Sequence, residues 1–172
     1  SLFPFADTPF GFKILNNCAA DLRQIGRRAL DARLRLVNHP DQYVVLNSES
    51  PAVVRNSLTI LDAQAAVFDL LEQPRSPWAA IEIHGGKSGR GPSLIRTVHN
   101  LEEPIRARLV LENDERAFGA ADMLAICQEA GVPMVFDAHH HVVHERLSSY
   151  EHPSVAYYLN AAQKTWPDPA WQ

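Results

Sequence analysis

Four residues of types that bind metal ions stand at the ends of four separate apolar runs: His39, His84, Glu112 and Asp137. The runs they end are the β-rich segments 34–39, 80–84, 108–112 and 134–137. Because the carboxyl ends of parallel strands converge on one face of an α/β fold, we expect these side chains to meet there. Imidazole and carboxylate together suit Mn, Zn or Fe better than an all-oxygen Ca or Mg site. The alternative is that these polar groups only cap strand ends, but then a metal-binding residue type would have to occur by chance at each of four successive strand ends.

The run from Asp137 to His141 offers three adjacent histidines. An aspartate at a strand end and a histidine three residues later can reach one cation or two adjacent cations, and this spacing selects His140. His139 and His141 are expected to point elsewhere, as hydrogen-bonding or solvated groups. A helical zinc pair of His140 and His144 is a weaker alternative, because no zincin motif accompanies it.

The segment 39–43 contains an aromatic and an amide side chain that suit contact with a nucleobase. Tyr43 can stack on a base and Gln42 can hydrogen-bond to one. Judged from its residues alone, however, the segment is more typical of a turn capped by Asp41 with a partly buried tyrosine.

A glycine-rich segment, 85–91, follows His84. It is not a phosphate-binding P-loop, because Ile81 stands where that motif needs its first glycine. Lys87 and Arg90 within it could still contact a DNA phosphate, a contact that positions a duplex without reading its sequence.

Helical patterns separate the apolar runs, at about 15–33, 50–71, 93–103, 117–130 and 154–166. Strands that alternate with helices predict βαβ units and a parallel sheet. Glu82 and His84 point the same way from their strand, as a polar pair at the mouth of a barrel would. We therefore predict an α/β fold of the TIM-type (β/α)8 class in one domain, 1–172, with about five of the eight strands, counting 2–5 as a possible further strand.

The composition narrows the functional class. The chain has 172 residues, of which 46% are apolar and 21% charged, an ordinary globular balance. No apolar run approaches the roughly 18–20 residues that span a bilayer, so we expect no membrane association and a cytoplasmic protein, or a nuclear or mitochondrial one in a eukaryote. The net charge of −4 argues against a broad basic surface for nucleic acid, although bound cations can supply local positive charge.

At these same residues the sequence resembles the UV damage endonuclease family. The matching segments occur in the family's order and spacing, and they are Leu2–Ala6, Asn38–Tyr43, Ile83–Gly86, Leu111–Glu115 and Phe136–His140. The resemblance covers nearly the whole chain.

The resemblance implies a barrel similar to that of endonuclease IV, with a divalent metal cluster, typically Mn²⁺, at its carboxyl face. Such enzymes nick damaged double-stranded DNA on the 5′ side of UV photoproducts and other lesions. The ligands it implies are His39, His84, Glu112, Asp137 and His140. It also implies that Gln42 and Tyr43 probe the distorted duplex. Glu112, His84 and Asp137 are the predicted catalytic residues, with Glu112 the best candidate for a bridging carboxylate.

The sequence departs from the family pattern in its extent. The last two strands of the family barrel, which supply further histidine and carboxylate ligands and a lysine, have no counterpart here, and neither does the first strand. Segment 7–9 also lacks a histidine ligand that is usual in the family. A partial barrel leaves two sheet edges exposed, which favours association. The alternatives to a repair endonuclease, or a fragment of one, are an inert metal-binding fragment and, less favoured, a sugar isomerase or epimerase. A base-probing loop has no purpose in the last of these.

Overall fold

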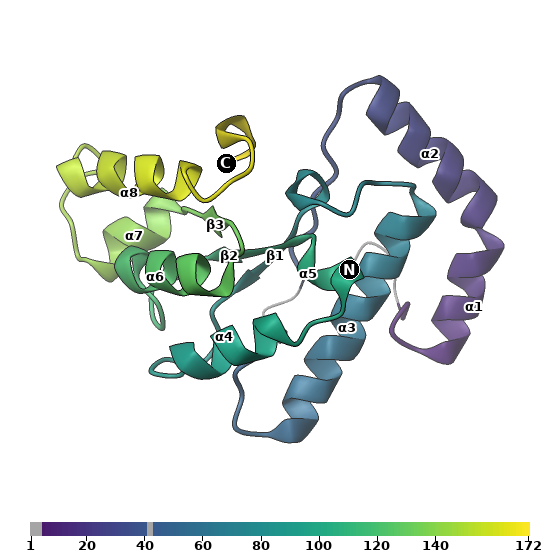
Figure 1. The fold of residues 1–172 in the computed structure, drawn as a ribbon, viewed down its shortest axis with the longest axis horizontal. Coiled ribbons are helices and arrows are strands. Elements are labelled where there is room, and N and C mark those ends of the chain that lie inside the picture. The colour runs from purple at the N-terminus through teal and green to yellow at the C-terminus, as the bar shows by residue number, and fades with distance from the viewer. Residues whose placement is uncertain (1–4, 41–42) are drawn as a thin grey trace.

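A small parallel sheet lies at the centre of the chain. The computed structural model describes residues 5–40 and 43–172. Three strands, β1 (Ile81–His84), β2 (Leu109–Glu112) and β3 (Met134–Val135), lie in the order β1-β2-β3 (Figure 1). The register pairs His84 with Glu112 and Glu112 with Val135. The carboxyl ends of all three strands therefore lie at one edge of the sheet.

Helices surround the sheet. Within the described residues they are α1 (Pro9–Asn17), α2 (Ala19–Asp31), α3 (Pro51–Leu70), α4 (Gly91–His99), α5 (Glu103–Arg106), α6 (Ala120–Ala130), α7 (Ala138–His144) and α8 (Pro153–Gln163), with 3-10 turns at Pro77–Ala79 and Pro169–Trp171. In Figure 1, α1, α2 and α3 lie on one side of the sheet and α6, α7 and α8 on the other. None of the helices in the described ranges is long and apolar enough to cross a membrane.

The core forms where the apolar faces of these elements meet the sheet. All of β2 is buried, because α6 packs on it and because β1 and β3 flank it. Ile81 and Ile83 of β1 are buried, whereas Glu82 and His84 between and after them are half-buried. This alternation follows from the two-residue repeat of a strand, and it directs the polar pair away from the apolar core.

Arg108, immediately before β2, is fully buried. Its Nη2 atom donates to Asp69 Oδ1 at 2.8 Å and to the carbonyl oxygen of Gln73 at 2.8 Å. Its Nε atom donates to the carbonyl oxygen of Pro74 at 3.2 Å. A buried guanidinium with these partners ties the end of α3 to the start of the central strand.

The expected sheet was too large. Of the segment 34–39, only Asn38 pairs with the sheet, through a single bridge to Ile81, and Leu34 and Val37 are exposed. The segment 134–137 is a strand over two residues only. The further strand expected at 2–5 lies outside the described residues, except for Phe5 in a turn. The described ranges thus contain three of the four strands that were expected within them.

Two predicted helices are each divided. The helix expected at 15–33 corresponds to the last residues of α1 and, after a break at Cys18, to α2. The helix expected at 93–103 corresponds to α4, which ends at His99, and Glu103 begins the separate α5. In α2, Gly26 lies so close to the carbonyl of Leu71 that a Cβ atom would overlap it, so this crossing requires glycine. Gly131 ends α6 in the left-handed conformation, which glycine adopts readily after a helix.

The two outer edges of the sheet carry local contacts. Asn38 covers part of the β1 edge. On the β3 edge, the backbone N–H of Met134 donates to Thr165 Oγ1 at 2.8 Å, and Trp166 Nε1 donates to the Met134 carbonyl at 2.6 Å. Side chains after α8 thereby satisfy the backbone groups that a neighbouring strand would pair with.

Candidate metal centre

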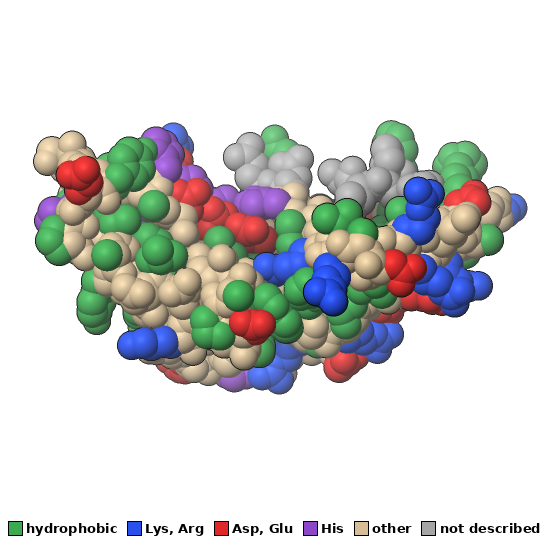
Figure 2. All heavy atoms as spheres, turned by 90° about the horizontal axis from the view of Figure 1, so that it is seen from above, with side chains coloured by type: hydrophobic (Ala, Val, Ile, Leu, Met, Phe, Trp, Pro, Cys, Tyr) green, Lys and Arg blue, Asp and Glu red, His purple; other side chains and the backbone are tan. Residues whose placement is uncertain are grey.

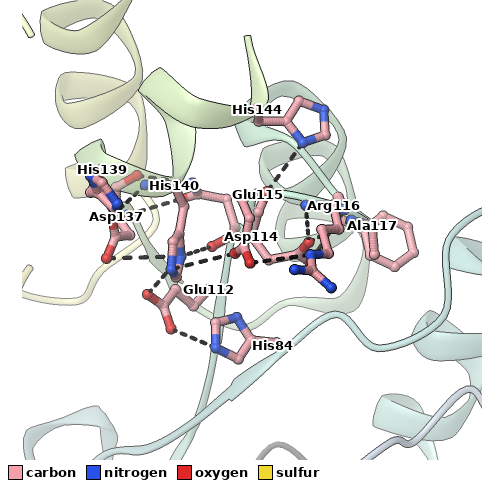
Figure 3. Close-up of polar contacts among 12 residues, drawn as sticks. His84, Glu112, Asp114, Glu115, Arg116, Ala117, Asp137, His139, His140 and His144 are labelled. Carbon is pink, nitrogen blue, oxygen red and sulfur yellow. Dashed lines mark hydrogen bonds and ion pairs between the residues drawn. The ribbon is translucent and has the colours of Figure 1, made fainter. Parts of the chain in front are cut away.

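Glu112, the last residue of β2, lies at the centre of the carboxyl edge and is 5% exposed. One carboxylate oxygen, Oε2, is 3.2 Å from His39 Nε2 and 3.6 Å from His84 Nε2. The other oxygen, Oε1, is 3.4 Å from His140 Nδ1. Figure 3 shows His84 and His140 on either side of the Glu112 carboxylate.

These side chains form two groups of possible metal ligands that share Glu112. The first is His39, His84 and Glu112, and the second is Glu112, Asp137 and His140. Within each group, one donor atom from each residue lies within 4.8 Å of the others. The five residues predicted as ligands are therefore brought together, as the strand-end argument requires.

The second group is ordered by the start of α7. Asp137 is the N-cap of that helix, and its Oδ1 atom accepts a hydrogen bond from the backbone N–H of His140 at 2.7 Å. The second carboxylate oxygen, Oδ2, lies 3.8 Å from His140 Nδ1. A capping aspartate favours a helical turn, and this turn places the residue three positions later on the same side of the helix as the aspartate.

The donor chemistry fits a cation. His39 Nδ1 lies 2.9 Å from the carbonyl oxygen of Pro40, which can only accept, so this nitrogen carries the hydrogen. In the neutral ring Nε2 then presents a lone pair toward Glu112 Oε2. Two acceptors that face each other need a proton or a metal cation between them, and a bound cation would take the place of the proton that Glu112 or His39 carries in its absence. His84 Nδ1 is buried without a hydrogen-bond partner within the described residues.

The electrostatics of the site disfavour the charged form of the central carboxylate when no cation is bound. Burial, and then the nearby carboxylate of Glu82, raise the pKa of Glu112 to about 8, with His39 opposing the shift. The pKa of His84 is lowered by burial and by the neighbouring histidines His39 and His140. A divalent cation would reverse both effects, because it favours the ionised carboxylate and the neutral imidazole.

The remaining histidines of α7 have other partners. His139 Nδ1 lies 2.6 Å from the hydroxyl of Tyr150, and His141 Nε2 lies 2.9 Å from Ser154 Oγ. His144 Nδ1 lies 3.2 Å from the carbonyl oxygen of Asp114 and belongs to neither ligand group. The geometry therefore does not support the alternative zinc pair of His140 and His144.

A cavity of about 360 Å³ adjoins the ligand groups, lined by His39, His84, Lys87, Glu115 and Arg116 among others. Histidine and acidic side chains gather along this face of the molecule (Figure 2). Predicted ligands and basic side chains thus line the same cavity.

Of the predicted DNA-contacting residues, Lys87 lines this cavity, whereas Tyr43 and Arg90 are not among its lining residues. Tyr43 is 66% exposed, whereas Gln42 lies outside the described residues. Arg90 Nε donates to the carbonyl oxygen of Asn47 at 2.6 Å, and its Nη1 atom pairs with the exposed carboxylate of Glu49 at 3.2 Å. Lys87 lies on the cavity wall.

Three further residues border the site without having been assigned a role from the sequence. Glu115 Oε2 lies 3.6 Å from His140 Nε2, Glu82 acts on the charge of Glu112, and Arg116 lines the cavity. Glu115 belongs to the same motif as Glu112, and Glu82 precedes His84 by two residues, so both had a sequence signal. Arg116 had none beyond its charge.

Comparison with known proteins places this arrangement in a family. A family model described as UV-endonuclease UvdE matches residues 1–172. The chain belongs to this family. A UV DNA damage endonuclease of a Nostoc species is 51% identical over 100% of this chain and 54% of the relative. One of Deinococcus radiodurans is 45% identical over 100% of this chain and 57% of the relative.

The UvdE fold is also found among solved structures. The crystal structure of SacUVDE matches with a TM-score of 0.84 and 30% sequence identity, covering 95% of this chain and 56% of that one. The chain thus spans about half the length of the UvdE relatives that it matches.

Proposed function

We propose that this chain supplies the metal-binding part of a DNA repair endonuclease that cuts damaged double-stranded DNA on the 5′ side of UV photoproducts and other lesions. The observation that carries the proposal is the pair of ligand groups that share the buried carboxylate of Glu112. Membership of the UvdE family supports it independently. Shared ligands are suited to holding two cations close together, an arrangement common in phosphodiester hydrolysis.

The proposed cofactor is a cluster of divalent cations, with Mn²⁺ favoured by the mixture of imidazole and carboxylate donors. His39 and His84 would hold one cation, Asp137 and His140 another, with Glu112 between them. When bound, such cations supply the Lewis acidity and positive charge that hydrolysis of a phosphodiester requires. We assign the catalytic role to Glu112, His84 and Asp137.

The protein's own groups position the substrate around this centre. Tyr43, exposed at the rim, would stack against a base of the distorted duplex, and Gln42 would hydrogen-bond to one. Lys87 and Arg90 would contact backbone phosphates. Arg90 can do so by exchanging its exposed pair with Glu49, which costs little because exposed ion pairs are weak.

We further propose that the three-stranded sheet is part of a TIM-type barrel that is completed by chain corresponding to the rest of the relatives' length. The support is the parallel β1-β2-β3 order with helical crossovers, together with a match to about half of each relative. An incomplete barrel would associate through the parts of its sheet edges that Asn38, Thr165 and Trp166 leave unpaired. The oligomeric state in solution, measured by light scattering, tests this part.

The function is tested by incubating the protein with UV-irradiated duplex and Mn²⁺ and following single-strand nicks. We expect nicks on the 5′ side of lesions, and we expect Glu112→Gln to abolish them, because it removes the shared anionic ligand. Nicking at an unchanged rate in this variant would remove Glu112 from catalysis.

Glu129→Gln is the matched control. Glu129 is exposed near the end of α6, at the opposite edge of the sheet from the ligand groups. Both substitutions remove one negative charge, so a general charge effect on DNA binding would appear in both. Only the Glu112 substitution should stop nicking.

A further inference from the structure

Asn113, the residue after Glu112, is completely buried. Its side-chain Nδ2 atom donates to the carbonyl oxygen of Asp137 at 3.0 Å, and its Oδ1 atom accepts from the backbone N–H of Asp137 at 2.9 Å. The side-chain amide therefore pairs with both backbone groups of Asp137, as a neighbouring strand would. It continues the pairing of β2 with β3 beyond Val135, where the strand itself ends.

The backbone of Asn113 contacts the same ligand group. Its carbonyl oxygen lies 2.9 Å from His140 Nδ1, which must donate because a carbonyl can only accept. This hydrogen bond fixes the orientation of the ring. The nitrogen left with the lone pair that a cation needs is therefore Nε2, which lies 3.6 Å from Glu115 Oε2, and not the Nδ1 atom that faces Glu112. One residue thus contacts Asp137 through its side chain and His140 through its backbone, and it adjoins Glu112 in the chain.

A second buried asparagine makes the same pattern elsewhere. Asn47 is also completely buried, its Nδ2 atom donates to the carbonyl of Lys87 at 3.0 Å, and its Oδ1 atom accepts from the Lys87 backbone N–H at 2.8 Å. Lys87 belongs to neither ligand group. Asn47 therefore offers a control with equal burial and the same two-point pairing, but without a ligand attached.

From this geometry we infer that Asn113 is a positioning residue for the metal centre: its amide sets the distance of Asp137 and His140 from Glu112, and so determines affinity at the second ligand group. The inference rests on the proposed metal-binding function. It predicts an effect on cation binding that loss of a buried hydrogen-bonded amide elsewhere does not produce.

The test is titration of the protein with Mn²⁺ by calorimetry, and with Co²⁺ by visible absorption, in the wild type, Asn113→Ala and Asn47→Ala. Urea unfolding of the metal-free proteins measures the stability that each substitution removes. We expect both alanine variants to lose stability, and only Asn113→Ala to lose roughly 10- to 100-fold in affinity at one of two sites, as loss of a partner that orients metal ligands does. Its Co²⁺ spectrum should also change.

Asn113→Asp covers the case in which the alanine variant does not fold. Aspartate keeps the volume and the acceptor for the Asp137 N–H, but places an oxygen against the Asp137 carbonyl. We expect weaker binding despite the added negative charge, which by itself would strengthen it. Wild-type cation affinity in the folded Asn113 variants, or an equal loss of cation affinity in Asn47→Ala, would overturn this inference but not the proposed function. A wild-type protein that binds neither cation would overturn the proposed function as well.

Discussion

Replacement of Glu112 by glutamine should change stability in opposite directions with and without a cation. Glu112 is buried with a pKa raised to about 8. Because this value lies above the ordinary pKa of 4.5, the metal-free wild type should lose stability as pH rises from about 4.5 to about 8. Glutamine has nearly the same shape and does not titrate, so the variant should not show this loss.

The size of the effect follows from the shift. At about 1.4 kcal/mol per pKa unit, moving the carboxyl group from its ordinary value to about 8 corresponds to roughly 4 to 5 kcal/mol. This is an upper bound, because relaxation and water entry at the ionised carboxylate would reduce it. Metal-free Glu112→Gln should therefore be more stable than the wild type at pH 8, and the two proteins should converge near pH 5.

Addition of Mn²⁺ should reverse the order. A ligand that binds only the folded state stabilises it by about 2.7 kcal/mol at a concentration 100 times its Kd. The wild type should gain this increment at pH 8, and the variant should gain little, because both ligand groups have lost their shared anion. Urea unfolding of both proteins at pH 5 and pH 8, each with EDTA or with Mn²⁺, measures their stability under all four conditions. Parallel pH curves in EDTA, together with equal stabilisation by Mn²⁺, would refute the reasoning.

Three other substitutions test separate parts of the structure. Arg108→Met should lower the free energy of unfolding by roughly 3 kcal/mol, because it removes the hydrogen-bond donor of Asp69 and of buried carbonyl oxygens. Urea titration measures this loss, and a loss below about 1 kcal/mol would mean that the guanidinium contributes little. Lys87→Ala should weaken binding to damaged and undamaged duplex alike and reduce the slope of log K against log salt by about 1, and an unchanged slope would exclude a phosphate contact. Tyr43→Ala should weaken binding to UV-irradiated duplex more than to intact duplex while Mn²⁺ affinity stays unchanged, and equal weakening of both duplexes would argue against base probing.

The position of the ligand groups could be predicted because it depends on a general property of parallel sheets. His84 and Glu112 end neighbouring strands in register, so their side chains must lie together. Asp137 follows β3, a strand of only two residues. Asp137 also caps the start of α7, a position that aspartate favours. Local propensity and sheet geometry agree at these positions.

The element that carries His39 could not be predicted correctly. The apolar residues of 34–39 suggested a strand, but Arg33 adopts a positive φ of 55° and only Asn38 reaches β1. Pairing along a strand depends on which chain segments lie beside it, and the sequence pattern of one segment does not contain that information. His39 nevertheless reaches Glu112, because a single bridge suffices to direct the next residue toward the sheet edge.

The buried asparagines also escaped prediction. Asn113 and Asn47 bond to backbone groups 24 and 40 residues away. Neither residue type nor spacing indicates such pairing, because it arises only when the loops are folded against each other. The division of the 15–33 helix at Cys18 is similar, since the apolar stripe alone gave no sign of a break there.

The proposed metal centre requires that two cations share Glu112. Anomalous diffraction from crystals soaked in Mn²⁺ measures this. We expect two peaks at the carboxyl edge of the sheet, each bonded to a different oxygen of Glu112, with His39 and His84 at one and Asp137 and His140 at the other. Peaks whose ligands exclude Glu112, or a map without peaks at this edge, would contradict the account.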